Sequence, residues 1–130
     1  MDHHLKPQRF NFRSLRHADN GRALALQDLG RVDEAERAFT EALALEPNAA
    51  TTHSNLGNLH FRRGELERAR EEYRAAVRLD PDYADAHNNL GSVYYRLGDR
   101  AAAQAEYRSA LRLNPASEGA RRNLGIVLGE

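Results

Sequence analysis

The chain contains 130 residues without cysteine or tryptophan, and its 19 lysine and arginine residues balance 19 aspartate and glutamate residues. This length fits one compact domain and excludes a large catalytic domain joined to a recognition domain. The lack of cysteine excludes a disulfide framework, a thiolate metal site and a cysteine nucleophile, and the net charge of zero argues against a general nucleic-acid binder.

The first fifteen residues lie outside the regular pattern of the rest of the chain. They carry Lys6, Arg9 and Arg13 with aromatic residues between them. Three interpretations remain open: an extra helix over the following helices, an extended arm that enters the groove of another copy of the chain, or a mobile terminus. Neither this segment nor the rest of the sequence has an apolar run of signal-peptide or membrane-span length, so we expect a soluble, cytoplasmic protein.

From residue 16 onward the sequence repeats itself, and Pro47, Pro81 and Pro115 mark the interval of 34 residues. The same interval relates five further sets, namely Gly30, Gly64 and Gly98; Ala35, Ala69 and Ala103; Phe39, Tyr73 and Tyr107; Ala42, Ala76 and Ala110; and Leu45, Leu79 and Leu113. We therefore divide the chain into an arm, 1–15, and an array, 16–130, with units at 16–49, 50–83 and 84–117 and a terminal helix at 118–128.

Each unit is predicted to form a hairpin of two helices. In the middle unit the helical spacing of apolar residues covers 51–63 and 66–79. Gly64 can adopt the left-handed conformation that ends the first helix. Pro81 ends the second helix because it lacks an N–H donor and restricts Asp80. The predicted fold class is therefore all-α.

These positions resemble the pattern of the tetratricopeptide repeat family. The middle unit matches it at Leu56, Gly57, His60, Gly64, Ala69, Tyr73, Ala76 and Pro81, and the next unit at Leu90, Gly91, Tyr94, Gly98, Ala103, Tyr107, Ala110 and Pro115. The resemblance implies a right-handed superhelix of helical hairpins, about seven helices in all, in which the first helix of each unit lines a concave groove. The terminal helix would cover the last unit, with Ile126, Val127 and Leu128 leaving apolar surface exposed.

The resemblance also places a row of asparagines in this groove. Counting Arg16, Ala50, Ala84 and Glu118 as position 1, position 6 holds Gly21, Asn55, Asn89 and Asn123. An amide side chain has a donor and an acceptor, so Asn55, Asn89 and Asn123 could hold an extended peptide by its backbone. The row is similar to the asparagine ladder of O-linked N-acetylglucosamine transferases, whose catalytic domain is absent here. The alternative is that these asparagines are ordinary polar surface residues.

Further groove positions supply secondary contacts to the same peptide. They are Asn58 and Ser92 at position 9, Phe61 and Tyr95 at position 12, and Arg62 and Arg96 at position 13. The aromatic rings offer apolar area and the guanidinium groups offer bidentate pairing with carboxylates. The alternative is that the two aromatic residues pack between units and the two arginines are solvated.

Other functional patterns are weaker. A clamp for a chaperone tail needs basic residues in the groove, but the corresponding places hold Asn20, Leu24, Asn55, Asp85 and Asn89. The outer helices carry a stripe of Arg74, Arg78, Arg108 and Arg112, which either binds phosphates or acidic partners or is simply solvated. His53 and His87 are interpreted as packing residues, and we expect no metal site and no cofactor.

The sequence therefore predicts a non-catalytic interaction module that binds an extended segment of a protein partner through Asn55, Asn89 and Asn123. The alternative is a self-assembling scaffold protein, a homo-oligomer built through the arm or the exposed terminal helix. We do not expect a nucleic-acid partner, because the charges balance. No serine, histidine and aspartate set occurs in a setting that would activate a nucleophile, so catalysis is not expected.

Overall fold

The computed structural model describes residues 11–129, and this range contains seven α-helices and no strand. The helices are α1 (Asn11–Asp28), α2 (Val32–Leu45), α3 (Ala50–Arg62), α4 (Leu66–Leu79), α5 (Ala84–Arg96), α6 (Arg100–Leu113) and α7 (Glu118–Gly129). The all-α prediction is confirmed. The helix α1 begins before Arg16, inside the segment assigned to the arm, whereas the rest of the arm lies outside the described residues.

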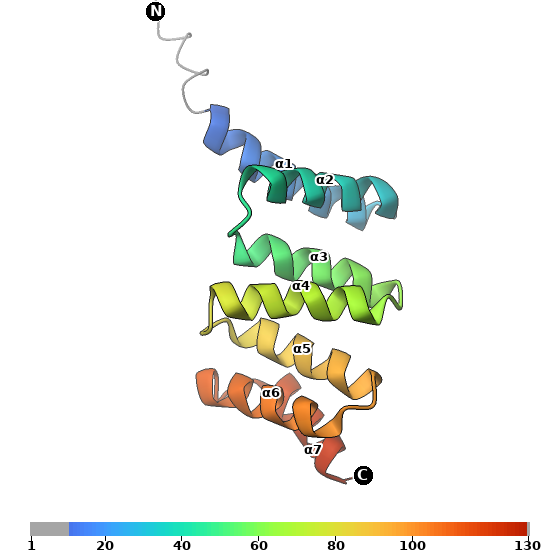
Figure 1. Ribbon diagram of the computed structural model, residues 1–130, viewed down its shortest axis with the longest axis vertical. Helices are drawn as coiled ribbons and strands as arrows, with labels where there is room; N and C mark the ends of the chain where they lie inside the picture. Colours follow the sequence, from blue (N-terminus) through green and yellow to red (C-terminus); the bar gives the residue numbers. More distant parts are fainter. Residues whose placement is uncertain (1–10, 130) are drawn as a thin grey trace, which may run out of the picture. The chain divides into compact units, whose positions relative to one another are not determined.

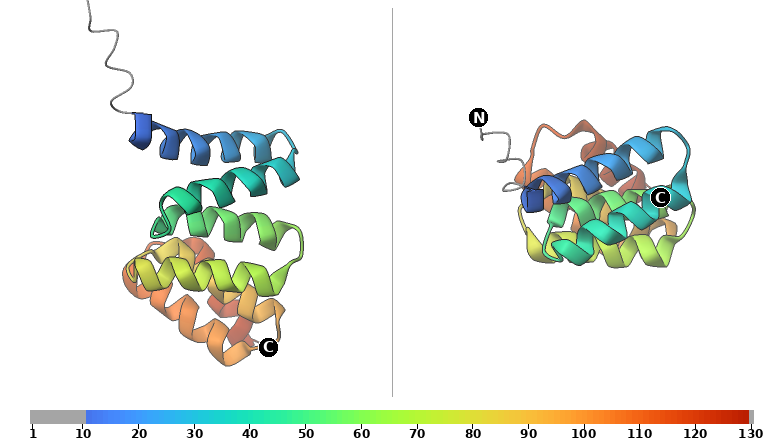
Figure 2. Two further views of the ribbon diagram at one scale, coloured as in Figure 1. Left: turned by 45° about the horizontal axis from the view of Figure 1, so that its top comes forward. Right: turned by 90° about the horizontal axis from the view of Figure 1, so that it is seen from above.

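The chain divides after Asn48 into two compact units. The first contains the hairpin of α1 and α2. The second contains the hairpins α3–α4 and α5–α6 followed by α7, in which α4 packs against α5 and α6 packs against α7 (Figure 1). Within each hairpin the two helices run antiparallel and are joined by a short turn, as Figure 2 shows from two further sides.

A glycine with positive φ ends the first helix of every hairpin. The φ angles are 82° at Gly30, 78° at Gly64 and 88° at Gly98. At the middle turn the N–H of Glu65 donates to the carbonyl of His60 over 2.9 Å, which satisfies one of the free carbonyls at the end of α3. The prediction for Gly64 is confirmed, because a side chain is disfavoured in this left-handed region.

The second helix of each hairpin in the second unit ends two residues before a proline. After α4 the side chain of Asp80 accepts the N–H of Asp82 over 3.2 Å, and after α6 the side chain of Asn114 accepts the N–H of Ala116 over 3.3 Å. These short polar side chains close a turn by bonding to the backbone two residues ahead. Each hairpin therefore passes to the next helix without a long loop.

The core of the second unit repeats from hairpin to hairpin. Ala69, Tyr73, Leu90 and Val93 form one buried cluster between α4 and α5. Ala103, Tyr107 and Val127 form the corresponding cluster between α6 and α7. Small residues at the alanine positions let the helices approach closely, and the tyrosine rings fill the space that remains.

The terminal helix α7 corrects one expectation. Val127, which we expected to be exposed, is 2% exposed because its place on the helix faces α6, whereas Ile126 and Leu128 are 45% and 52% exposed as expected. Ser117 accepts the N–H of Ala120 over 3.2 Å at the start of the helix. Near its end, Arg100 donates to the carbonyl of Val127 over 2.7 Å.

Candidate functional site

The first helices of the second unit lie next to one another and carry the predicted site. The helix α5 packs against both α3 and α7. We call the polar surface that these three helices share the ladder face, which consists of Asn55, Asn58, Asn88, Asn89, Ser92 and Asn123, all of them partly buried. The three asparagines of the predicted ladder are thus distributed one to a helix, as the repeat requires.

A pair of amides joins α5 to α3. Asn89 donates from Nδ2 to Oδ1 of Asn58 over 3.3 Å. The same oxygen accepts the hydroxyl of Tyr73, which reaches it from α4. Because its oxygen accepts two donors, the side chain of Asn58 is held in one orientation.

A different pair joins α7 to α5. Asn123 donates from Nδ2 to Oδ1 of Asn88 over 3.1 Å, so its partner is the residue at position 5 rather than the one at position 9. Ser92, at position 9, donates to the backbone carbonyl of Asn88 over 3.3 Å and lies 3.0 Å from the hydroxyl of Tyr107. Asn123 and Asn89 thus each donate a hydrogen bond to an asparagine of the preceding first helix, but the acceptors occupy different positions of the repeat.

The hydroxyl of Tyr73 reaches the ladder face because a glycine leaves room for the ring. A Cβ atom on Gly57 would lie 2.8 Å from Cε1 of Tyr73, and one on Gly91 would lie 2.7 Å from Cε1 of Tyr107. Burial raises the pKa of both tyrosines above the ordinary value, so both stay protonated at neutral pH and can donate.

The tyrosines and Asn88 were not predicted as part of the site. Tyr73 and Tyr107 were interpreted as packing residues, and their rings are indeed buried. The sequence did contain a signal for them, in the pairing of positions 9 and 24 of each unit. The two units with a tyrosine at position 24 have Asn58 or Ser92 at position 9, whereas the unit with Phe39 at position 24 has Leu24 at position 9. A hydroxyl thus occurs only where a polar partner is present.

The amides of the ladder keep unused capacity. Asn89 and Asn123 each spend one N–H on a neighbouring helix, and among the contacts of the described residues each retains a carbonyl oxygen and a second N–H. This is the same pair of groups that one peptide unit needs. Asn55 is partly buried on α3.

The aromatic and basic residues of the site lie at the turn end of the first helices. Phe61 and Tyr95 are half-buried, and each packs against the buried cluster next to its helix. Arg62 and Arg96 are exposed, and the guanidinium carbon of Arg96 lies 5.5 Å from the centre of the Phe61 ring. This is within cation–π range, so Arg96 is positioned on an aromatic platform.

The histidines make hydrogen bonds that the sequence interpretation did not include. Nδ1 of His53 lies 2.8 Å from a carboxylate oxygen of Glu72, and Nδ1 of His87 lies 2.7 Å from one of Glu106. Each pair therefore joins the two helices of one hairpin, in addition to packing. Within residues 11–129 no group of three histidine, cysteine, aspartate or glutamate side chains is arranged to hold a metal ion.

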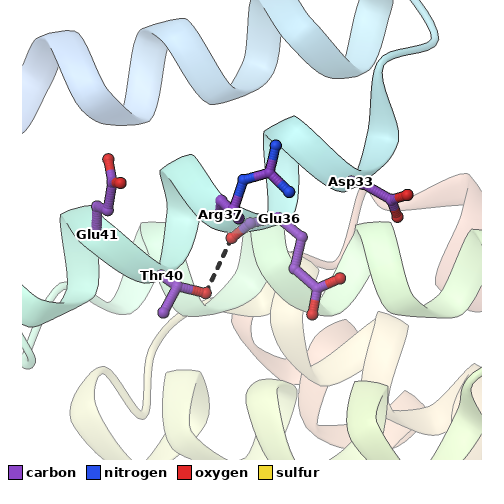
Figure 3. Close-up of a pocket in the computed structure, with 5 residues that line it drawn as sticks. All are labelled: Asp33, Glu36, Arg37, Thr40 and Glu41. Carbon is purple, nitrogen blue, oxygen red and sulfur yellow. Dashed lines mark hydrogen bonds between the residues drawn. The ribbon is translucent and has the colours of Figure 1, made fainter.

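The outer surface and the first unit carry the remaining features. Arg74, Arg78, Arg108 and Arg112 are exposed on α4 and α6. A hollow of about 420 Å³ lies on α2, and its described lining residues are Asp33, Glu36, Arg37, Thr40 and Glu41 (Figure 3). In Figure 3 the hydroxyl of Thr40 donates to the backbone carbonyl of Glu36 over 2.9 Å. The described residues that line this open hollow all come from one helix, and their side chains do not converge on one point as catalytic groups do.

Stacked helical hairpins joined through side-chain amides define a helical-repeat protein with a polar face. Sequence comparison agrees, because the pattern described as TPR repeat matches residues 23–64 and 57–98, and the one described as Tetratricopeptide repeat matches 84–117. These matches cover well over half of the chain. The chain therefore belongs to the tetratricopeptide repeat family.

Solved structures show the same fold. The first TPR of Spaghetti (RPAP3), solved with an HSP90 peptide, is 21% identical, with a TM-score of 0.86 over 89% of this chain and 92% of that one. The second TPR domain of human RPAP3, solved with an HSP70 peptide, is 19% identical, with a TM-score of 0.85 over 92% of this chain and 99% of that one. These identities support similarity of fold alone.

A mutant of the O-GlcNAc transferase of Thermobaculum terrenum is more similar in sequence. It is 31% identical over 90% of this chain, with a TM-score of 0.83, but the chain spans only 22% of that protein. Comparison with curated protein sequences finds no match. None of the helices in residues 11–129 combines the length and the apolar composition of a membrane span.

Proposed function

We propose that this chain is a non-catalytic module that binds an extended peptide segment of a protein partner along the ladder face. The observation that carries the proposal is the row of amides on α3, α5 and α7. Asn89 and Asn123 are oriented by bonds to neighbouring helices and keep a carbonyl oxygen and an N–H available. A peptide unit presents the complementary groups, so such a row reads backbone and tolerates many side chains.

The neighbouring residues fit secondary roles in the same proposal. Asn58 and Ser92 extend the polar row, whereas Phe61, Tyr95, Arg62 and Arg96 provide apolar area and positive charge at the turn end of α3 and α5. An acidic side chain of the ligand would pair with the two arginines. A packed array holds these groups before binding, so association mainly costs the ordering of the ligand.

The peptide complexes of the two RPAP3 domains support peptide binding by this fold but do not identify the partner. The basic residues of a chaperone-tail clamp have no counterpart here, because Asp85 and Asn89 occupy two of the expected places. We therefore propose a different protein segment as the ligand, without a cofactor, a reaction or a nucleic-acid partner. The same proposal places the module in the cytoplasm.

The proposal is tested by affinity capture from the lysate of the source organism. The bait is compared with the variant Asn55→Ala/Asn89→Ala/Asn123→Ala and with the control Arg74→Ala/Arg108→Ala on the outer surface. We expect a partner that is retained by the wild type and the control and lost from the ladder variant. Circular dichroism and urea titration establish that the ladder variant is folded, because removal of Asn89 and Asn123 also removes two inter-helix hydrogen bonds. Capture of the same partners by all three baits would refute the ladder as the binding site.

Self-assembly is the second candidate, and the exposed Ile126 and Leu128 on α7 favour it. The alternative contact element, the arm at 1–15, begins outside the described residues. Light scattering over a concentration series distinguishes the two functions. A scaffold gains mass with concentration, whereas a peptide-binding module keeps the mass of one chain.

A further inference from the structure

The terminal helix α7 occupies the place of a first helix, and within residues 11–129 it packs on α6 and α5 without a second helix of its own. Val127 packs on Ala103 and Tyr107 of α6, as Val93 packs on Ala69 and Tyr73 of α4. The two valines are one repeat apart. The register of the array thus continues into α7, and the position that α4 and α6 occupy beside α3 and α5 is open beside α7.

The open position contains a specific notch. The Cβ positions of Gly57 and Gly91 are closed by the rings of Tyr73 and Tyr107, at 2.8 and 2.7 Å. At Gly125, the next glycine of the series, no atom lies within 4 Å of the Cβ position, and the residue is exposed. The same backbone notch therefore occurs three times and is filled by an aromatic ring twice.

Apolar side chains border the empty notch. Leu128 is 52% exposed, whereas His60, which occupies the same position in α3, is 4% exposed. Ile126 is also exposed. These side chains stand where the preceding units are covered by a second helix, so the array itself indicates what kind of element would cover them.

We propose that this face of α7 binds an amphipathic helix supplied by a partner, which carries alanine, glutamate, phenylalanine and alanine at positions i, i+3, i+4 and i+7. The alanines and the aromatic ring reproduce the stripe of Ala69, Tyr73 and Ala76 on α4 and of Ala103, Tyr107 and Ala110 on α6. The helix would complete a fourth hairpin.

Phenylalanine rather than tyrosine follows from the residue at position 9. Asn58 and Ser92 interact with the hydroxyl groups of Tyr73 and Tyr107. In α7 this position is Ile126, which offers no partner to a buried hydroxyl. The first hairpin has Leu24 at position 9 and the buried Phe39 in place of the tyrosine.

The glutamate follows from the residue at position 4. His53 and His87 bond to Glu72 and Glu106, each of which directly precedes the tyrosine of its helix. In α7 position 4 is the exposed Arg121, which donates from one nitrogen to the carbonyl of Pro115 over 2.5 Å. A guanidinium group has five N–H donors, so a carboxylate before the aromatic residue of the incoming helix would find a cation there.

A partner helix is favoured over a second copy of the chain. The helices α4 and α6 that carry this stripe are already packed in their own hairpins, where both tyrosines are buried. A second copy would have to open a hairpin to supply one of them. A helix from a partner carries no such cost.

The test uses a fluorescent peptide with the sequence of α6, Arg100–Leu113, carrying Tyr107→Phe, titrated with the full chain. This peptide contains the complete proposed stripe. Since a short helix is marginal in water, the titration extends to millimolar concentration. We expect saturable binding that is weakened at least about fivefold by Gly125→Ala, because the added methyl group fills the notch and overpacks the interface.

Matched controls separate the notch from other effects. Gly129→Ala makes the same substitution in the same helix, in open space, and is expected to leave binding unchanged. Asn55→Ala/Asn89→Ala is also expected to leave it unchanged, which separates this surface from the ladder face. A peptide with alanine in place of the phenylalanine should not bind, and Arg121→Ala should weaken binding about threefold, in the range of one exposed ion pair.

Three results would overturn the proposal. One is the absence of saturable binding up to millimolar peptide. Another is equal affinity for wild type and Gly125→Ala. The third comes from light scattering. If the mass of the wild type increases with concentration and Gly125→Ala abolishes this increase, the α7 face binds a second copy of the chain.

Discussion

At the scale of single residues, the glycines at position 8 connect the core to the ladder face. Gly57 admits the ring of Tyr73, and the hydroxyl of that ring fixes Asn58, which in turn holds Asn89. A substitution on the buried side of α3 therefore reaches the polar side. The orientation of the ladder depends on a residue that offers no side chain at all.

This connection predicts opposite effects for the same substitution at two glycines. Gly57→Ala should destabilise the chain by about 1–3 kcal/mol, because its Cβ would lie 2.8 Å from the Tyr73 ring. Gly21→Ala, in open space on α1, should be neutral or stabilise by up to about 1 kcal/mol through helix propensity. Urea unfolding measures both. Equal changes at the two sites would show that the Tyr73 ring does not restrict Gly57.

The hydroxyl itself can be tested without moving the ring. Tyr73→Phe removes one hydrogen bond and should cost about 0.5–1.5 kcal/mol. The side-chain amide resonances of Asn58 and Asn89 should broaden or shift in NMR spectra, because Asn58 loses one of its two donors. Tyr83→Phe, in the turn before α5, serves as the control. Unchanged amide resonances in Tyr73→Phe would contradict the orienting role.

A second residue-scale prediction concerns acid stability. The hydrogen bond from His60 lowers the pKa of Glu65 below its ordinary value. A carboxyl group whose pKa is lower in the folded state stabilises that state above the unfolded pKa of about 4.3, and this stabilisation is lost as pH falls through the folded pKa. Glu65→Gln removes this contribution. The urea midpoints of wild type and variant should differ at pH 7 and converge toward pH 3, and a constant difference would contradict the assignment.

At the scale of the helices, most boundaries were predictable because they rest on local chemistry. The 34-residue interval, Gly64 and Pro81 predicted helices at 51–63 and 66–79, and the structure has them at Ala50–Arg62 and Leu66–Leu79. The first unit was predicted to start at residue 16, whereas α1 already includes residues 11–15, where neither the repeat nor a turn residue gives a signal. A helix end that is set by a turn glycine or a proline can be predicted from one sequence.

The turn glycines give the prediction at this scale. Gly98 has a φ of 88° and open space around its Cβ position, so Gly98→Ala should cost about 1–2 kcal/mol purely through backbone conformation. Gly98→Asn should recover part of the loss, because asparagine tolerates the left-handed region better than alanine does. The urea midpoints of the wild type, Gly98→Ala and Gly98→Asn measure the order of their stabilities. A stability of Gly98→Ala equal to that of the wild type would show that the turn can adopt another conformation.

At the scale of the whole molecule, the sequence predicts which helices carry the three asparagines but not which hydrogen bonds these asparagines make. The repeat interval alone places Asn55, Asn89 and Asn123 on equivalent helices. It cannot tell that Asn123 bonds to Asn88 while Asn89 bonds to Asn58, because that choice depends on the residue at position 9, which differs between units. Periodicity predicts what the units share, and the exceptions between units require the packed structure.

The balance of charges leads to a final prediction that separates the two surfaces of the second unit. Recognition through amides exchanges one set of hydrogen bonds for another, whereas binding on Arg74, Arg78, Arg108 and Arg112 would release counterions and weaken steeply with salt. We expect a captured partner to remain bound between about 0.05 M and 0.5 M salt, with at most a few-fold loss from the exposed Arg62 and Arg96. Partner retained on washed beads gives the measurement. Two results together would assign binding to the outer arginines instead of the ladder face. They are complete elution of the partner from the wild type by salt, and loss of the partner from Arg74→Ala/Arg108→Ala already in dilute buffer.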